Sequence, residues 1–160
     1  MSRPLALPLR RTLIRLSIAA VCGGVPTSSL AAQQAGTAGG DSAAIRRVIA
    51  EQYVNAVFVV RDEAGVRRGF HPRFHLFVLD ADTVIVAPLD MWLGRLKLDG
   101  VPRSDAMRHD VALLDIAGDA AVVRTELFEN GRHIYTDYFS LYRFRDGGWR
   151  IVSKIFQDRD

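Results

Sequence analysis

Hydrophobic and polar residues alternate with a period of two through the last third of the chain, from Met107 onward. This period is typical of β-strands whose two faces meet different surroundings. Asn130-Gly131 is the strongest turn signal here, because a two-residue type I′ turn needs positive φ at both positions. The pattern predicts four antiparallel strands, at about 107 to 117, 120 to 129, 132 to 144 and 149 to 157, joined at Gly118-Asp119, Asn130-Gly131 and Asp146-Gly147-Gly148.

The region before these strands shows helical spacing. Asp41 or Ser42 can cap a first helix. A second, short helix is expected after Asp62 and ends near Phe70, because His71-Pro72 stops helical propagation. The apolar stripe of the first helix is formed by Ile45, Val48, Ile49, Tyr53, Ala56, Val59 and Val60.

Between these helices and the meander, the sequence predicts one hairpin and one further helix. Phe74 to Leu79 and Thr83 to Ala87 are expected to form two short strands. Pro88 is suited to the start of a third helix, which contains Trp92 and ends near Gly100-Val101-Pro102.

The Asn130-Gly131 turn also predicts the register of the sheet. The numbers of paired residues then sum to 261, which places Arg124 opposite Asp137. The face that carries Tyr138 is nearly uncharged, whereas the other face carries Asp137 and Lys154. Because burying several unpaired charges is costly, we expect the helices to cover the uncharged face. Apolar residues mixed into the charged face indicate a partner subunit, and therefore a homodimer through the outer sheet face.

The N-terminus has the pattern of a secretory signal peptide. Arg10, Arg11 and Arg15 precede an apolar run from Leu16 to Val21, and small residues follow at 28–32. We expect cleavage after Ala31 or Ala32, and a periplasmic or secreted protein. The expected organisation is a signal peptide at 1–32, a flexible linker at 33–40 and one domain at 41–160.

Two other interpretations of this segment are disfavoured. A membrane anchor is unfavourable because the apolar run is short and is broken by Gly23, Gly24 and Pro26. Cys22 is the only cysteine, and bulky Val21 argues against its being a lipid-carrying residue. The mature chain then has no thiol, which excludes disulfides and cysteine ligands, and no integral membrane segment is expected in it.

The net charge changes when the signal is removed. The full chain has a net charge of +3, but loss of the four basic residues in 1–32 leaves 17 basic residues against 18 acidic ones. A surface that binds nucleic acid is therefore not expected.

The order of elements and several short motifs resemble the nuclear transport factor 2-like superfamily. Tyr135-Thr136-Asp137-Tyr138, the turn at Asp146 to Val152, and the closing Lys154-Ile155-Phe156 look most like its putative lumazine-binding branch, close to the SnoaL-like proteins. This resemblance implies an α+β fold, a cone-shaped roll with N-terminal helices packed on a curved antiparallel sheet. It also implies a pocket at the open end of the cone, and often a homodimer.

Resemblance to the ketosteroid isomerase branch of this superfamily tests an enzymatic interpretation. By that resemblance Tyr53 falls where the branch has a tyrosine that stabilises an oxyanion, Val78 near its aspartate base, and Ser140 at its protonated carboxylic acid. Without a carboxylate at the base position, proton abstraction by that mechanism is not expected. The catalytic residues, if any, stay unknown.

Two groups of residues are candidates for a site. Arg124, Asp137 and Lys154 form a secondary polar cluster, which is either a ligand site or an ion-pair network at the subunit interface. Aromatic walls with a few hydroxyls suit a flat, partly polar small molecule. The residues expected to line the pocket of the cone for such a ligand are Gln52, Tyr53, Trp92, Tyr138, Ser140, Tyr142 and Ser153.

The sequence predicts neither a metal site nor a cofactor. Its four histidines, at 71, 75, 109 and 133, lack metal-ligand spacing. We therefore expect an exported small-molecule-binding protein with an aromatic-lined pocket that acts as a homodimer. The alternatives are a small cofactor-free enzyme of the same fold (an isomerase, dehydratase or hydrolase), and a dimerising interaction module with a filled cone.

Overall fold

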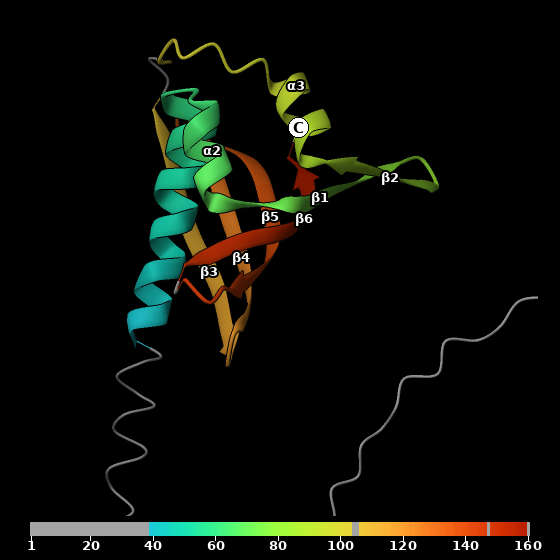
Figure 1. Ribbon diagram of the computed structural model, residues 1–160. Coiled ribbons are helices and arrows are strands. Elements are labelled where there is room, and N and C mark those ends of the chain that lie inside the picture. The colour runs from blue at the N-terminus through green and yellow to red at the C-terminus, as the bar shows by residue number, and fades with distance from the viewer. Residues whose placement is uncertain (1–38, 104–105, 147, 160) are drawn as a thin grey trace, which may run out of the picture.

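The computed structural model describes residues 39–103, 106–146 and 148–159, so the expected signal peptide lies outside the described residues. Figure 1 shows an α+β arrangement in which helices lie against one face of a curved sheet. None of the helices in the described segments is long and apolar enough to cross a membrane.

The first helix runs along the sheet and supplies much of the core. Residues 39–47 are α-helical, and the helix continues as the wider π-type segment η1, Val48–Val59. Its last turn keeps the wide spacing, since the Val60 N–H donates to the Asn55 carbonyl five residues earlier at 2.8 Å. Ile45, Ile49 and Tyr53 are fully buried, as the helical spacing predicts.

Helix α2, Glu63–Gly69, follows at once and packs on η1. Asp62 caps it by accepting hydrogen bonds from the backbone N–H of Ala64 at 3.0 Å and of Gly65 at 2.9 Å. At its end, Gly69 lies so close to Gln52 that a Cβ at this position would overlap the Gln52 side chain. Glycine is therefore needed here to let the two helices approach.

The sheet has six strands in the order β2-β1-β6-β5-β4-β3, and helix α3, Leu89–Leu96, follows β2. The predicted antiparallel arrangement is wrong at one place, because β1 and β6 are parallel. The last strand of the chain, β6, lies between β1 and β5 and is not an edge strand. The strands are β1 (Phe70–Asp80), β2 (Thr83–Pro88), β3 (Met107–Ala117), β4 (Ala120–Glu129), β5 (Arg132–Arg143) and β6 (Trp149–Asp158).

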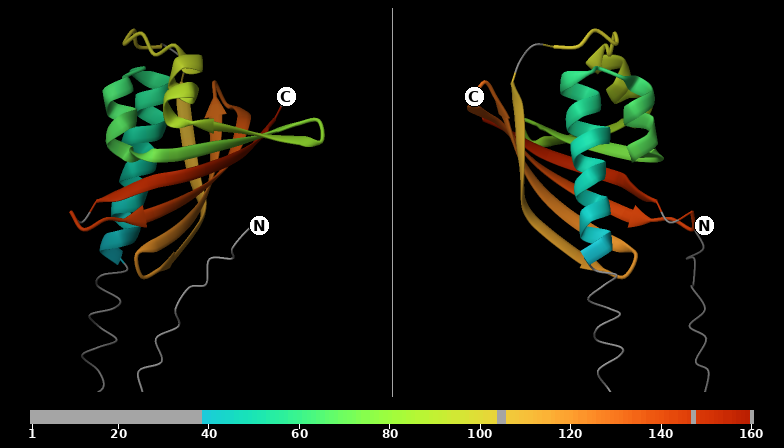
Figure 2. Two further views of the ribbon diagram at one scale, coloured as in Figure 1. Left: turned by 45° about the vertical axis from the view of Figure 1, so that its right-hand side comes forward. Right: turned by 90° about the vertical axis from the view of Figure 1, so that its left-hand side faces the viewer.

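The curvature of the sheet creates an interior and an exterior face. The two views of Figure 2 show strands β3 to β6 bending around the long first helix. The β1–β2 hairpin extends away from this body. Among its side chains, Leu79 is 75% exposed and Val84 57% exposed, so the hairpin carries apolar surface outside the core.

A bulge between β4 and β5 overturns the predicted register. The predicted pairing holds next to the turn, where Asn130 and Gly131 both have positive φ and Phe128 pairs with His133. The register then shifts by one residue, so that Arg124 lies opposite Tyr138 and not opposite Asp137. Because side chains alternate with a period of two, this single extra residue exchanges the two faces of β5.

The exchange places the charged side chains inside. Asp137 is fully buried and Phe139 is 2% exposed, whereas Tyr138 is 44% exposed and Tyr142 is 52% exposed. A second bulge, between β5 and β6, brings Lys154 to the same interior face as Asp137. The prediction that the helices cover the face of Tyr138 is therefore wrong.

Polar contacts fix the beginning of the first helix to the end of β5 and the start of β6. Asp41 accepts hydrogen bonds from Arg143 at 3.0 Å and from Trp149 Nε1 at 3.1 Å. Arg143 also bridges to Asp119 at 2.7 Å. The two contacts of Asp41 join residues more than one hundred positions apart and reach the end of β5 and the start of β6.

Candidate functional site

Three polar side chains meet inside the cone. The Tyr53 hydroxyl of η1 donates to Asp137 Oδ2 of β5 at 2.6 Å. Lys154 Nζ of β6 donates to the Tyr53 oxygen at 2.5 Å and lies 2.8 Å from Asp137 Oδ1. All three are buried, with 0% of Tyr53 and Asp137 and 6% of Lys154 exposed. We call Tyr53, Asp137 and Lys154 the buried triad.

Burial governs the protonation behaviour of the triad. It raises the pKa of Tyr53 well above its ordinary value, and the adjacent Asp137 raises it further. Burial lowers the pKa of Lys154, while the charge of Asp137 partly opposes this effect. Tyr53 is therefore a hydroxyl donor at neutral pH, and the ammonium of Lys154 depends on Asp137 for its charge balance.

Aromatic rings surround the Lys154 ammonium. Nζ lies 4.7 Å from the ring centroid of Tyr53, 5.2 Å from that of Phe156 and 5.7 Å from that of Phe139. Ring faces attract a cation, most strongly where water is excluded. These rings provide an apolar wall that also stabilises the positive charge.

Tyr53 and Lys154 of the triad border a small cavity between η1, α3 and the sheet, which we call the inner cavity. Its volume is about 120 Å³. Of the predicted ligand-binding residues, Tyr53 and Trp92 line it. The lining residues are Tyr53, Val57, Phe58, Leu76, Trp92, Leu96, Tyr135, Lys154 and Phe156.

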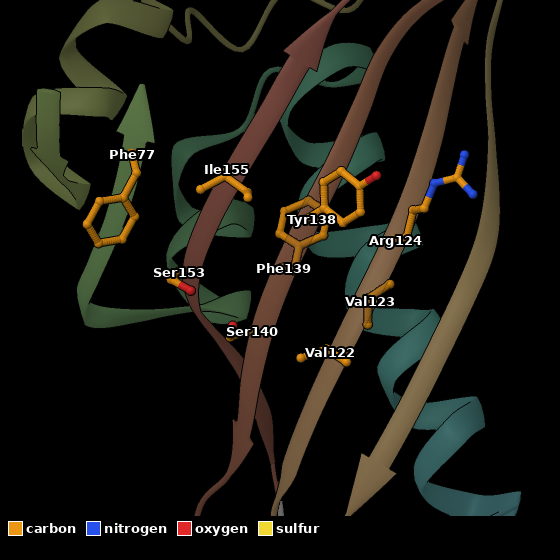
Figure 3. Close-up of a pocket in the computed structure, with 9 residues that line it drawn as sticks. All are labelled: Phe77, Val122, Val123, Arg124, Tyr138, Phe139, Ser140, Ser153 and Ile155. Carbon is orange, nitrogen blue, oxygen red and sulfur yellow. The ribbon is translucent and has the colours of Figure 1, made fainter. Parts of the chain in front are cut away.

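A larger depression lies on the opposite face of the sheet, and we call it the outer groove. Its volume is about 310 Å³, and side chains from β1, β6, β5 and β4 line it. Figure 3 shows Ser140 and Ser153, which pair directly across β5 and β6, near Phe77 and Tyr138. Their small size leaves the hollow between larger neighbours.

The structure thus divides the predicted pocket residues between two faces. Tyr138, Ser140 and Ser153 line the outer groove, and Tyr142 lies with Ser140 in a neighbouring hollow of about 220 Å³. The expectation that they face the interior of the cone, including the superposition of Ser140 on an interior carboxylic acid, is wrong. The β4–β5 bulge is the reason.

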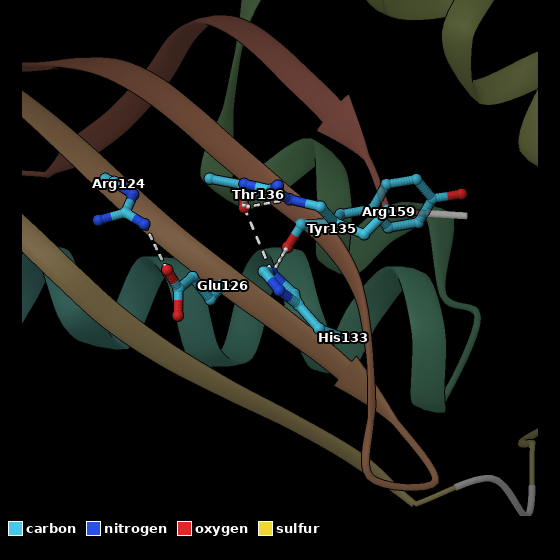
Figure 4. A network of polar contacts seen from close by, with 6 residues as sticks. All are labelled: Arg124, Glu126, His133, Tyr135, Thr136 and Arg159. Atoms are coloured by element: carbon cyan, nitrogen blue, oxygen red, sulfur yellow. Dashed lines mark hydrogen bonds and ion pairs between the residues drawn. The ribbon is translucent and has the colours of Figure 1, made fainter.

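Two other predicted positions also change. Gln52 is half-buried against Gly69 and does not line the inner cavity. Arg124 does not belong to the secondary polar cluster, because it lies on the exterior face. There its Nη2 atom lies 2.5 Å from Oε1 of Glu126, and Figure 4 shows this ion pair. Asp137 and Lys154 do form a close pair, although inside the cone and not toward the exterior.

The pattern of the sequence could have indicated this interior pair. Asp137 has the same parity along β5 as Phe139 and Leu141, both of which are nearly fully buried. Phe58, Tyr135 and Phe156 were missed as cavity residues, because the assumed register placed Tyr135 and Phe156 outside. Among the residues described here, no group of three His, Cys, Asp or Glu side chains is arranged to hold a metal ion.

Comparison with known proteins assigns the family. The family model described as "Putative lumazine-binding" matches residues 40–157. The chain belongs to the putative lumazine-binding family. A search of curated proteins gives no match.

Solved structures show the same fold. An NTF2-like protein of unknown function from Shewanella baltica OS155 has a TM-score of 0.64 at 24% identity, over 76% of this chain and 95% of that chain. One from Silicibacter pomeroyi DSS-3 has a TM-score of 0.64 at 20% identity, over 76% and 98%. One from Methylobacillus flagellatus KT has a TM-score of 0.60 at 23% identity, over 76% and 94%. The predicted NTF2-like fold is confirmed.

Proposed function

We propose that the protein is an exported binder of a small, planar, uncharged molecule, which enters the inner cavity and presents a carbonyl-type acceptor to Lys154. The observation that carries this proposal is the position of the Lys154 ammonium in the wall of an aromatic cavity, with its charge already balanced by Asp137. Such a group can hydrogen-bond a ligand without needing a negative charge from it.

The chemistry of Lys154 sets the polar end of the ligand. An ammonium has three N–H groups; Tyr53 accepts one of them, and Asp137 Oδ1 lies 2.8 Å from Nζ as its ion-pair partner. A further N–H is proposed to bind an acceptor in the cavity. A carboxylate there would add negative charge to a buried pair that is neutral overall, at a large desolvation cost, so a carbonyl is favoured.

The dimensions of the cavity set the size of the ligand. A cavity of roughly 150 Å³ in another protein holds benzene, so the inner cavity of about 120 Å³ suits a single ring or a smaller molecule. Lumazine, after which the family is described, has two rings and requires the cavity to widen. Trp92 and Tyr53, whose ring centroids are 6.5 Å apart, are proposed to pack against the single planar ring of the ligand.

The two lysines of the chain provide a direct test. Lys154 lines the cavity and Lys97 is exposed on the far end of α3. We expect acetophenone, a single ring with one carbonyl, to slow acetylation of Lys154 by acetic anhydride while leaving that of Lys97 unchanged, as measured by peptide mass spectrometry. Equal rates at Lys154 with and without the probe would contradict the proposal.

A cavity-filling variant separates this site from the outer groove. Leu96→Trp places a large ring in the inner cavity, whereas Met91→Trp changes a half-exposed position on the same helix. We expect the first to abolish protection of Lys154 by acetophenone and the second to preserve it. If Leu96→Trp leaves the protection intact, the probe binds elsewhere.

Export is part of the proposal and rests on the N-terminal sequence. Arg10, Arg11 and Arg15 before the apolar run, and Ala31-Ala32 after it, support a cleaved signal. After expression in a secreting bacterial host, the intact mass of the protein should correspond to a chain that begins at Ala32 or Gln33. A chain that retains residues 1–31 would contradict export by this route.

A homodimer through the exterior sheet face is the third part. Four large apolar or aromatic side chains around the outer groove are each 44–53% exposed: Val122, Tyr138, Tyr142 and Ile155. An exposed apolar patch of this kind is typical of a surface that binds another protein chain. Sedimentation should give a dimer for the native chain and a monomer for Ile155→Asp. Val101→Asp, at an exposed loop position, should stay dimeric, and a native monomer at micromolar concentration would contradict the assignment.

A further inference from the structure

Lys154 presents its amino group, and not only its stem, to the inner cavity. Three of the rings that line this cavity surround Nζ, and the centroids of Tyr53, Phe156 and Tyr135 lie 4.7 Å, 5.2 Å and 6.0 Å from it. Only 6% of Lys154 is exposed. A molecule in the cavity therefore meets a primary amine that bulk water hardly reaches.

Two hydrogen bonds connect this amine to a proton acceptor. Lys154 Nζ donates to the Tyr53 oxygen at 2.5 Å, and the Tyr53 hydroxyl donates to Asp137 Oδ2 at 2.6 Å. Transfer of one proton along each hydrogen bond gives a neutral amine at Lys154 and a carboxylic acid at Asp137, while Tyr53 remains a hydroxyl. The net charge of the buried triad does not change, so this relay avoids the cost of an isolated buried charge.

Burial favours the neutral amine that such a relay produces. It lowers the pKa of Lys154, so less free energy is needed to remove the proton than at an exposed lysine. A neutral lysine amine attacks carbonyl carbon, and lysines in apolar pockets form Schiff bases in this way. The other lysine of the chain, Lys97, is exposed and lies outside the cavity, so it provides an internal comparison.

We infer that Lys154 forms a reversible covalent Schiff base with a ligand that carries an aldehyde or ketone group, and that Tyr53 and Asp137 transfer the protons of this reaction. The inference rests on the proposed function, because it needs the carbonyl of the ligand to lie next to Lys154 in the inner cavity. It also narrows the class of ligand, since amide-type carbonyls, such as those of lumazine, do not form Schiff bases.

The protons and electrons of this reaction balance within the triad. The Lys154 amine attacks the carbonyl carbon, a C–N bond forms as the C=O π bond breaks, and an amine proton moves to the oxygen to give a neutral carbinolamine. The proton held by Asp137 then returns through Tyr53 to this hydroxyl group, which leaves as water while the nitrogen lone pair forms the C=N bond. The product is an iminium, which keeps the positive charge of the ammonium beside the ionised Asp137.

Reductive trapping tests the inference. Benzaldehyde is a single ring with one aldehyde, and cyanoborohydride reduces its iminium to a stable benzylamine while sparing the free aldehyde at neutral pH. In the native protein, peptide mass spectrometry should show benzylation of Lys154 at least about tenfold faster than that of Lys97, because burial and the relay supply the neutral amine.

A second measurement does not depend on entry of the reductant. Each cycle of Schiff-base formation and hydrolysis replaces the carbonyl oxygen with an oxygen from water. The protein should therefore accelerate exchange of the acetophenone oxygen with isotopically labelled water, Leu96→Trp should lose this acceleration, and Met91→Trp should keep it. Exchange no faster than in buffer, together with benzylation of Lys154 no faster than that of Lys97, would overturn the inference.

Tyr53→Phe tests the proton relay. It keeps the ring and removes the hydroxyl between Lys154 and Asp137. With benzaldehyde and cyanoborohydride both saturating, the rate of benzylation at Lys154 should fall at least about tenfold, which is the order of a general acid–base contribution. Tyr142→Phe makes the same change on the exterior face and should keep the native rate. An unchanged rate in Tyr53→Phe would overturn the relay.

Failure of this inference differs from failure of the proposed function. If acetophenone protects Lys154 from acetylation but neither benzylation nor oxygen exchange is accelerated, the ligand binds without a covalent bond and the Schiff base alone is overturned. If acetophenone gives no protection, the proposed function is overturned, and this inference with it.

Discussion

The Lys154 ammonium donates to the Tyr53 oxygen at 2.5 Å and thereby joins the last strand of the sheet to its first helix. The two residues are 101 positions apart in the chain, and both are buried. The candidate site is consequently formed by the same contact that closes the cone. Changes at this contact should affect binding and stability together.

Removal of one partner of the Asp137–Lys154 pair should be strongly destabilising. Lys154→Met leaves the buried Asp137 carboxylate without its cation, and breaking a buried pair in this way costs about 3–5 kcal/mol. Urea unfolding followed by circular dichroism should show this loss in the free energy of unfolding.

The double variant Lys154→Met, Asp137→Asn is the control for that prediction. It removes both charges, so its loss should be smaller than the sum of the two single losses by about 1 kcal/mol or more. Additive losses would mean that the two side chains do not form a stabilising pair.

Stability should depend on pH above neutrality through Lys154 and Tyr53. Burial lowers the pKa of Lys154 in the folded chain below the ordinary 10.5. Between the lowered pKa and pH 10.5 the unfolded chain binds more protons than the folded chain, so the free energy of unfolding rises with pH in this range. Because the pKa of Tyr53 is raised well above 10.0, the folded chain keeps a proton that the unfolded chain loses, and the free energy of unfolding falls above about pH 10.

Urea unfolding at intervals from pH 7 to pH 11 measures both effects. Tyr53→Phe should abolish the decrease in the free energy of unfolding that Tyr53 causes above about pH 10, and it should preserve the increase that Lys154 causes below that pH. The double variant Lys154→Met, Asp137→Asn should abolish the rise. A native profile that is flat over this range and equal to that of both variants would contradict the protonation states assigned here.

The elements of the fold were predictable because each depends on local sequence. The start of the second helix after Asp62, and Asn130-Gly131 as a turn with positive φ at both residues, were both confirmed. The faces of the sheet were not predictable by the same means. The β4–β5 bulge adds one residue without a glycine or proline to mark it, and every parity beyond it changes.

The burial of the triad was also not predictable from the sequence, for an energetic reason. Charges were expected outside because an isolated buried charge is costly. That cost falls when a partner and a hydroxyl lie within hydrogen-bond distance, as Tyr53 and Asp137 do around Lys154. Parity along β5 groups Asp137 with the buried Phe139 and Leu141, but no local signal indicates that Tyr53 and Lys154 will meet it.

Two buried threonines should respond in opposite ways to replacement by valine. Thr125 is fully buried and its Oγ1 atom has no hydrogen-bond partner among the described residues, so Thr125→Val removes an unsatisfied hydroxyl and should stabilise the protein by about 1 kcal/mol. Thr136→Val should destabilise it by about 1 kcal/mol, because it removes the acceptor for Arg159. Thermal unfolding of both variants checks the prediction, which fails if they shift in the same direction.

The contact between Asp41 and Trp149 should hold the first helix against the sheet. Asp41→Ala removes the acceptor for Arg143 and Trp149, and should cost about 1–2 kcal/mol and shift tryptophan fluorescence to longer wavelength. Asp119→Ala removes the more exposed partner of Arg143 and should cost less than about 1 kcal/mol without that shift. Equal effects would mean that the contact with Trp149 contributes nothing.

The position of β6 between β1 and β5 has a consequence for the order in which the chain can fold during synthesis. Until residues 149–158 have been made, the β1–β2 hairpin has no strand through which to join the meander, and Asp137 has no cation. The domain therefore cannot close around its cavity until β6 has left the ribosome. A nascent chain that lacks β6 stays open, so it cannot hold a ligand in the inner cavity before that strand appears.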